Sequence, residues 1–212
     1  MKKLLLLIAI CLPVLAMAKD KVDDTPYLSG AVPEENGVVT FQKSFKVLGK
    51  SKSDIYKTLK PWVENLVNTS IEAPGNYARF TMDTQDTIVA KVCEYQVYKQ
   101  KFLNLDRSRF RYTLIVCIDN ERVTIKQTAL AYYYGEDLEG NKGSNLRAEE
   151  WINDENALNK SKTKLLPKSG KFRRKTVDRA KELFEQAMDA FEEKEAPKAE
   201  PVRKVRKGIV EE

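Results

Sequence analysis

The chain has 212 residues, a formal net charge of +6 and a mean hydropathy of −0.50. This length suits one domain of ordinary size with extensions. The chain contains no histidine, which excludes Ser-His-Asp and Cys-His catalysis and most zinc sites. It also lacks the glycine-rich loops that hold phosphates in nucleotide-binding proteins. We therefore expect no cofactor and no metal.

Residues 1–18 have the three parts of a secretory signal peptide. Two lysines precede an apolar run over residues 4–15, and Ala16 and Ala18 supply the small residues that signal peptidase requires. We expect cleavage between Ala18 and Lys19. The protein is then exported, and is periplasmic or extracellular after signal-peptide removal.

A membrane anchor is not expected. The apolar run is too short to span a bilayer, and no later segment is long enough, so we expect no transmembrane span. Lipidation of Cys11 is disfavoured, because Ile10 stands where a lipobox has Gly, Ala or Ser.

The first elements after the signal peptide are a lead-in segment, a strand and a helix. Residues 19–36 are polar and contain two prolines. The alternating stretch GVVTFQKSFKV, which starts at residue 37, predicts a strand. Apolar residues at helical spacing then predict a helix after Ser51, with Asp54 completing a cap. Pro61 lies inside this helix and predicts a kink or a break.

Residues 78–134 alternate with a period of two, which predicts several antiparallel strands. A short turn around residues 120–121 predicts a hairpin. Its expected facing pairs are Ile118 with Val123, Val116 with Ile125, Leu114 with Gln127 and Tyr112 with Ala129. One face of this sheet is mostly apolar, so something must cover it.

The strongest helical pattern lies near the end of the chain and provides that cover. Within residues 171–194, Val177, Ala180, Phe184 and Phe191 recur every three or four positions, and Leu183 widens the stripe. The connection over residues 135–170 is polar, with a short helix expected around Trp151. Residues 195–212 have the composition of a disordered charged tail.

The predicted order of elements is strand, helix, antiparallel strands and long helix, and the start of the domain resembles a known family. YLSGAVPEENGVVTFQKSF followed by SKSDIY resembles the start of an exported bacterial family, domain of unknown function 4468, which has a TBP-like fold. The resemblance implies an α+β fold with a curved antiparallel sheet and helices packed on one face, of the TBP-like or helix-grip type. We expect one such domain over residues 37–194. The family supplies no known catalytic residues.

Cys93 and Cys117 are the two cysteines that follow the signal peptide. A hairpin centred on residue 105 would place them opposite each other, at a separation that a disulfide can bridge. Export also provides an oxidising compartment. A disulfide, two buried thiols and a redox pair all remain open at this point.

Carboxylates are the remaining groups for acid–base catalysis. Asp83 and Asp86 flank a turn, and Glu149 and Glu150 precede Trp151. Either pair suits a histidine-free hydrolase. Carboxylates in turns and at helix starts are, however, favoured for local structural reasons.

The basic character of the chain lies in its C-terminal quarter. Residues 19–159 hold 19 basic and 21 acidic side chains, whereas residues 160–212 hold 16 and 10. A patch that could bind an anionic surface is formed by Lys168, Lys171, Arg173, Arg174 and Lys175. A solvated basic loop is the simpler explanation. Export and the lack of interleaved aromatic residues argue against nucleic acid as a partner.

Tyr132, Tyr133 and Tyr134 cannot form one stacking platform, because alternation along a strand sends Tyr133 to the opposite face.

The sequence as a whole favours a non-catalytic exported binding or scaffolding module, whose partner is a protein or an envelope component. The first alternative is a carrier of a small apolar ligand, held in a pocket between sheet and helix. The second is the carboxylate hydrolase.

Overall fold

The computed structural model describes residues 23–70, 76–102, 104–136 and 142–192. The expected signal peptide and charged tail, with Ala18 and Lys19, lie outside the described residues. The elements in chain order are η1 (Thr25–Tyr27), β1 (Glu34–Glu35), β2 (Val38–Val39), β3 (Phe41–Lys46), α1 (Lys52–Ser70), β4 (Tyr77–Asp83), β5 (Thr87–Lys101), β6 (Asn104–Asp119), β7 (Arg122–Tyr134), β8 (Ser144–Arg147), α2 (Ala148–Trp151), α3 (Asp154–Ala157) and α4 (Gly170–Asp189).

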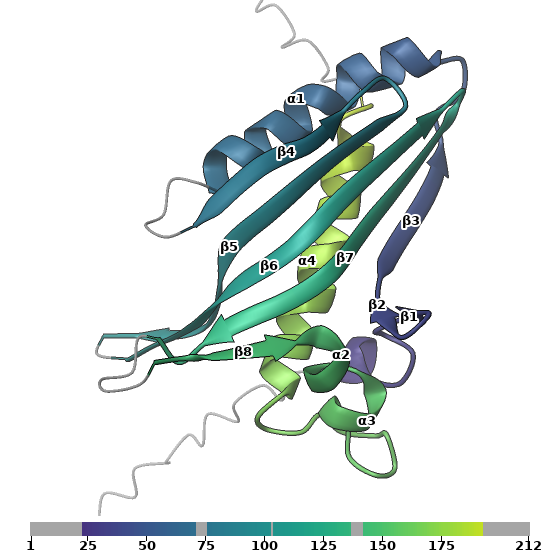
Figure 1. Ribbon diagram of the computed structural model, residues 1–212. Helices are drawn as coiled ribbons and strands as arrows, with labels where there is room; N and C mark the ends of the chain where they lie inside the picture. Colours follow the sequence, from purple (N-terminus) through teal and green to yellow (C-terminus); the bar gives the residue numbers. More distant parts are fainter. Residues whose placement is uncertain (1–22, 71–75, 103, 137–141, 193–212) are drawn as a thin grey trace, which may run out of the picture.

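Six strands form one antiparallel sheet in the order β3-β7-β6-β5-β4, with β8 also paired to β7. Helices α1 and α4 both lie behind this sheet in Figure 1, so that one face is covered by helices and the other is left open. The expected α+β class, with an antiparallel sheet and helices on one face, is confirmed. Among the described residues, no helix has the length and apolar character needed to cross a membrane.

The hairpin of β6 and β7 has the predicted register over its first half. Ile118 faces Val123, Val116 faces Ile125 and Leu114 faces Gln127. The predicted pair of Tyr112 with Ala129 is wrong, because the register shifts between Thr113 and Arg111.

This shift is a β-bulge around Ala129, which has a positive φ of 54°. Beyond the bulge, Phe110 faces Tyr132 and Ser108 faces Tyr134. The extra residue exchanges the two faces of β7, because side chains alternate with a period of two. Tyr132 therefore turns toward the helices, where it is fully buried and stacks on Phe110 with 5.3 Å between ring centroids.

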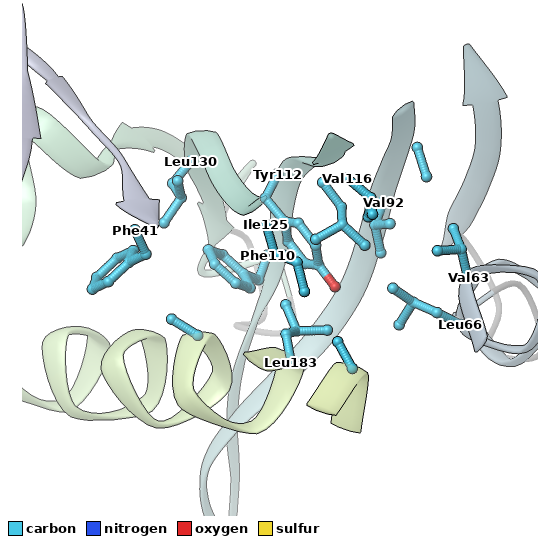
Figure 2. Packing of buried hydrophobic residues seen from close by; sticks show 14 of the residues in the cluster. Phe41, Val63, Leu66, Val92, Phe110, Tyr112, Val116, Ile125, Leu130 and Leu183 are labelled. Atoms are coloured by element: carbon cyan, nitrogen blue, oxygen red, sulfur yellow. The ribbon is translucent and has the colours of Figure 1, made fainter. Parts of the chain in front are cut away.

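The core lies between the covered face of the sheet and the two long helices (Figure 2). Leu183 of α4 is fully buried there, whereas Phe184 is only partly buried at the edge of the core. The predicted stripe of α4 is thus confirmed at Val177, Ala180 and Leu183, with Phe184 and Phe191 at its edge. On α1, the residues that face the sheet are Ile55, Leu59, Val63, Leu66 and Val67.

Helix α1 begins with the predicted cap. The backbone amide of Asp54 donates to Ser51 Oγ over 3.2 Å, and Ser51 Oγ donates to the Asp54 carboxylate over 2.6 Å. The helix continues through Pro61 to Ser70, so the predicted break does not occur. Proline removes one amide donor, and the buried residues on both sides of it keep the helix against the sheet.

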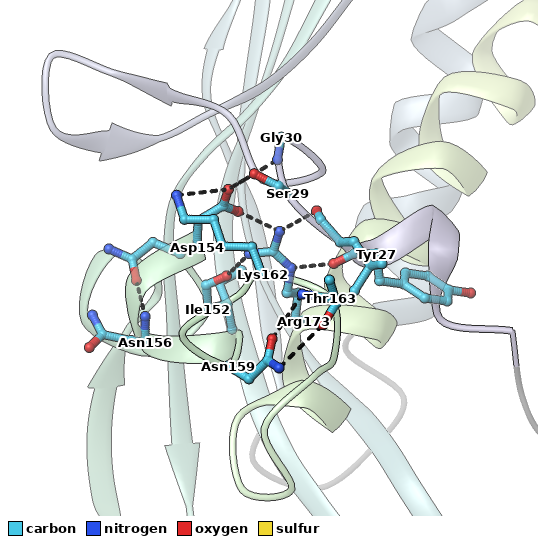
Figure 3. A network of polar contacts seen from close by, with 12 residues as sticks. Tyr27, Ser29, Gly30, Ile152, Asp154, Asn156, Asn159, Lys162, Thr163 and Arg173 are labelled. Atoms are coloured by element: carbon cyan, nitrogen blue, oxygen red, sulfur yellow. Dashed lines mark hydrogen bonds and ion pairs between the residues drawn. The ribbon is translucent and has the colours of Figure 1, made fainter.

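The segment before residue 37 is part of the fold, although it was expected to be only a lead-in. Val32 is buried in the core, and the carbonyl oxygens of Tyr27 and Leu28 each accept a hydrogen bond of 2.6 Å from Arg173. Figure 3 shows this arginine at the centre of a polar network that joins the segment to α3 and α4. The described domain therefore starts before the expected boundary.

Candidate functional site

A pocket of about 360 Å³ lies on the covered side of the sheet. It is formed where the ends of β7 and β8 meet α2 and the start of α4. Its lining residues are Tyr134, Gly135, Ser144, Leu146, Trp151, Lys168, Lys171 and Phe172. We call it the aromatic pocket.

Three rings form its walls. Phe172 is fully buried and lies edge-on to Tyr134 and to Trp151, with centroid distances of 5.1 and 5.9 Å. Such edge-to-face contacts hold rings in fixed orientations. The indole Nε1 of Trp151 is buried and donates to no acceptor in the described part of the chain. The walls are thus rigid and apolar, and the Nε1 of Trp151 is a hydrogen-bond donor without an acceptor among the described residues.

Lys171 lies at one side of the pocket and is held by an ion pair. Its Nζ is 2.7 Å from a carboxylate oxygen of Asp106 and 2.8 Å from the hydroxyl of Tyr134. It also lies 4.5 Å from the centroid of the Tyr134 ring, a distance typical of a cation–π contact. Its charge is balanced by Asp106, so Lys171 serves mainly to fix the tyrosine ring.

Lys168 supplies the unbalanced charge. It is exposed, lines the pocket, and forms no ion pair with any described residue. Ligand pockets typically combine apolar walls with a few polar groups that fix orientation. The aromatic pocket therefore suits a small molecule with a flat apolar body and an anionic end.

Comparisons with known proteins place the chain in a family. Residues 41–133 match the model of a domain of unknown function (DUF4468) with TBP-like fold. A crystal structure of a DUF4468 family protein from Bacteroides ovatus is 34% identical, with a TM-score of 0.71, and the match covers 85% of this chain and 100% of that one. The chain belongs to the DUF4468 family.

A second crystal structure supports the fold of this DUF4468 domain. A TBP-like protein from Parabacteroides distasonis is 19% identical, with a TM-score of 0.61, over 76% of this chain and 96% of that one. At this identity the likeness concerns the fold alone. A search among curated proteins found no match.

The five basic residues expected to form an anionic-surface patch do not form one in this DUF4468 domain. For Arg173 the expectation is wrong, because its guanidinium is fully buried and bonds to backbone carbonyls and Asp154. Arg174 pairs with Asp24 at 2.7 Å, and Lys171 pairs with Asp106. Lys168 and Lys175 are exposed but line different pockets. Helical geometry separates residues that are adjacent in the sequence.

The disulfide between Cys93 and Cys117, one of the three alternatives left open by the sequence, does not form, and only Cys93 of the two is buried. Cys93 faces Arg111, and Cys117 faces Thr87, so both thiols are free. The hairpin turns near residue 102 and not at residue 105, and a bulge follows Val97. The cysteines are therefore six positions apart along the strands, a separation of about 20 Å, whereas a disulfide needs Cα atoms within about 7 Å.

The four candidate carboxylates lie in ion pairs and hydrogen bonds of the DUF4468 fold. Asp83 pairs with Lys60 and Asp86 with Lys52, both on α1. Glu149 accepts a hydrogen bond of 3.0 Å from the backbone amide of Val39, and Glu150 lies 3.9 Å from Arg147. Asp83 and Asp86 thus join the β4–β5 turn to α1.

The prediction that Tyr133 lies on the opposite face of β7 from Tyr132 and Tyr134 is confirmed. Tyr132 lies in the core and Tyr134 lines the aromatic pocket, whereas Tyr133 faces Asn145 on the open side. Sequence reasoning did not assemble Trp151 and Phe172 into a site. Their only signal was the position of two aromatic residues at the ends of a polar, lysine-rich connection.

Proposed function

We propose that this protein is exported and acts without catalysis, as a binding protein whose aromatic pocket holds a small molecule with a flat apolar body and an anionic end. The observation that supports it is the convergence of Tyr134, Trp151 and Phe172 on one pocket with Lys168 at its rim. Export rests on the signal-peptide pattern of residues 1–18.

The apolar walls favour burial of a hydrophobic body. Burial of apolar surface contributes roughly 25 cal/mol per Å², and ring faces add a preference for flat, aromatic groups. Lys168, which pairs with no carboxylate in the described part of the chain, adds a preference for an anion at the mouth of the pocket. A scaffolding role for the rest of the surface is compatible with this function.

Fluorescence of Trp151 provides a direct test. The chain has two tryptophans, and the Trp62→Phe variant leaves Trp151 as the single reporter. The probe is 8-anilinonaphthalene-1-sulfonate, a flat aromatic anion. We expect saturable quenching of the Trp151 emission, with energy transfer to the bound probe.

Two variants in the Trp62→Phe background locate the binding. Ser144→Phe fills the pocket from β8 and should abolish binding, and Lys168→Glu should weaken it by about tenfold, a difference of about 1.4 kcal/mol. Lys160→Glu changes the charge equally at a residue that does not line the pocket, and should leave binding unchanged. Equal binding by all the variants would refute the proposed site. A native mass spectrum should also detect a ligand retained from the producing cell as a discrete adduct.

A further inference from the structure

The open face of the sheet is strongly basic. The register places nine basic strand residues on this face and one acidic residue, Asp119. The basic residues are Lys46, Arg79, Lys91, Arg107, Arg109, Arg111, Arg122, Lys126 and Arg147.

Two pairs of like charges face each other across neighbouring strands. Arg79 of β4 faces Lys91 of β5, and Lys46 of β3 faces Arg122 of β7. Like charges in such positions destabilise a sheet. Glutamates outside the sheet pair with Arg109, Lys126 and Arg147, but basic residues still outnumber acidic ones on this face. An excess of positive charge is the arrangement expected of a surface that attracts anions.

A second pocket, of about 290 Å³, lies on this open face and is distinct from the aromatic pocket. We call it the arginine pocket. Its lining residues are Tyr77, Cys93, Arg109, Arg111, Tyr133 and Asn145. These come from β4, β5, β6, β7 and β8, so the pocket exists only when the sheet is assembled.

One wall of the arginine pocket is fixed by a close contact. The hydroxyl of Tyr133 donates to the backbone carbonyl of Lys142, and the ring lies over Gly143. A Cβ added to Gly143 would lie 2.8 Å from Cζ of Tyr133, and the glycine has a φ of 72°. Only glycine fits this position without a shift of the ring.

Arg111 is the unusual member of the pocket. Its Nη2 donates to Oδ1 of Asn145 over 2.6 Å, whereas its Nε is buried and has no acceptor among the described residues. No carboxylate pairs with Arg111 within the part of the chain that the structure describes. Its side chain is half-buried, and removing a charge from water without a counter-charge is costly.

Four other half-buried or buried arginines have a carboxylate partner. Arg109, in the same pocket, lies 2.7 Å from Glu136, and similar pairs join Arg173 to Asp154, Arg174 to Asp24 and Arg179 to Glu94. Arg111 thus lacks the negative charge that this fold supplies elsewhere.

We propose that the arginine pocket binds a phosphate group, with Arg111 as its principal ligand. A phosphate monoester has a charge of about −1.5 to −2 and three acceptor oxygens, which suits a pocket that combines a guanidinium, an amide and the Tyr77 hydroxyl within a positive field. Arginine also matches oxyanions through two parallel hydrogen bonds. The phosphate belongs either to a small soluble molecule or to an anionic surface.

This site is independent of the proposed function. Tyr133 and Asn145 point to the open face, whereas their neighbours Tyr134, Ser144 and Leu146 line the aromatic pocket on the covered face. Each pocket can therefore be changed without filling the other.

The experiment measures binding of glycerol 3-phosphate by isothermal titration calorimetry, with acetate as the carboxylate control. Sedimentation with phosphatidylcholine vesicles that contain phosphatidic acid tests the surface-bound source, and pure phosphatidylcholine vesicles are its control. We expect binding to at least one phosphate probe, and weaker binding to acetate. Binding to the soluble ester identifies a small-molecule site, and binding to the acidic vesicles alone identifies a surface.

Three variants assign the binding to the pocket. Asn145→Asp places a carboxylate beside Arg111 with almost no change of shape, and should reduce phosphate binding by about tenfold or more while the protein stays folded. Arg111→Gln should have the same effect. Arg122→Gln removes the same charge from the same face, away from the pocket, and should change binding by less than about threefold.

The proposal is overturned if neither phosphate probe binds, if acetate binds as tightly as the phosphate, or if Asn145→Asp binds like the parent. An equal loss in Arg122→Gln also overturns it, because the face would then act as a diffuse charge. Binding of 8-anilinonaphthalene-1-sulfonate should be unchanged in Asn145→Asp, which separates this result from failure of the aromatic pocket.

Discussion

Arg173 of α4 donates from Nη2 to Oδ1 of Asp154 on α3 over 2.6 Å, and its guanidinium is fully buried. The same guanidinium donates to the carbonyl oxygens of Tyr27, Leu28 and Ile152. One side chain therefore joins the N-terminal segment, the two short helices and the long helix. Such a centre is sensitive to the loss of either charge, because the remaining charge stays buried.

Removal of Arg173 or Asp154 alone should strongly destabilise the protein. We expect Asp154→Asn to lower the free energy of unfolding by about 3 to 5 kcal/mol, because it leaves a buried guanidinium without its counter-charge. Urea unfolding measures this change. Asp24→Asn is the control, since its pair with Arg174 is partly exposed and should contribute about 0 to 1 kcal/mol. Equal losses in the two variants would contradict the assigned role.

The same pair predicts a dependence of stability on pH. Burial raises the pKa of Asp154, but hydrogen bonds from Ser29 and Arg173 outweigh this effect and hold the pKa below its usual value of 3.8. A lowered folded-state pKa means that the stabilisation is fully present above 3.8 and is lost as pH falls through the lowered pKa. Urea unfolding of parent and Asp154→Asn across this range should give free energies that converge as pH falls. A constant difference would exclude the linkage.

Leu183 should contribute more to stability than Phe184. Leu183→Ala removes a fully buried side chain and should cost about 2 to 5 kcal/mol. Phe184 is partly exposed, so Phe184→Ala should cost less although more atoms are removed. Thermal unfolding of the two variants, with the exposed Glu185→Ala as a control, establishes the order. The reverse order would contradict the burial of Leu183 at the centre of the buried stripe of α4.

The two cysteines should differ in reactivity. Cys117 is exposed, whereas Cys93 is buried and burial raises the pKa of its thiol, which lowers the fraction of reactive thiolate. For protein that begins at Lys19 and so lacks Cys11, we expect iodoacetamide, without reductant, to add one group to the folded protein and two to the protein in urea. Intact mass measures both. An unfolded protein that takes up no group would indicate a disulfide and would contradict the register of β5 and β6.

The exported protein should begin at Lys19. This prediction rests on the small residues Ala16 and Ala18, which signal peptidase favours. Peptide mapping of the protein recovered from outside the cytoplasm should yield an N-terminal peptide that starts at Lys19. An acylated Cys11 at the N-terminus would show a lipoprotein instead.

The sequence by itself determined the long strands, the two long helices and which face of the sheet is covered. The alternation along β6 and β7 and the helical stripe of α4 are local patterns, so they are readable without a structure. The register near the β6–β7 turn was predictable for the same reason, because a two-residue turn fixes which residues face each other as far as Leu114 and Gln127.

Only the tertiary structure decided the register beyond the two bulges and the composition of the pockets. A bulge adds one residue and leaves no clear trace in the sequence pattern. The bulge in β7 turned Tyr132 into the core. The bulge in β5, together with a hairpin turn earlier in the chain than predicted, separated Cys93 from Cys117. The aromatic pocket and the arginine pocket each combine residues from several elements. Their side chains meet because of how the sheet and helices pack, and no spacing along the chain encodes that distance. The buried position of Arg173 has the same origin, since a lysine- and arginine-rich run is typical of a surface until a folded segment closes over it.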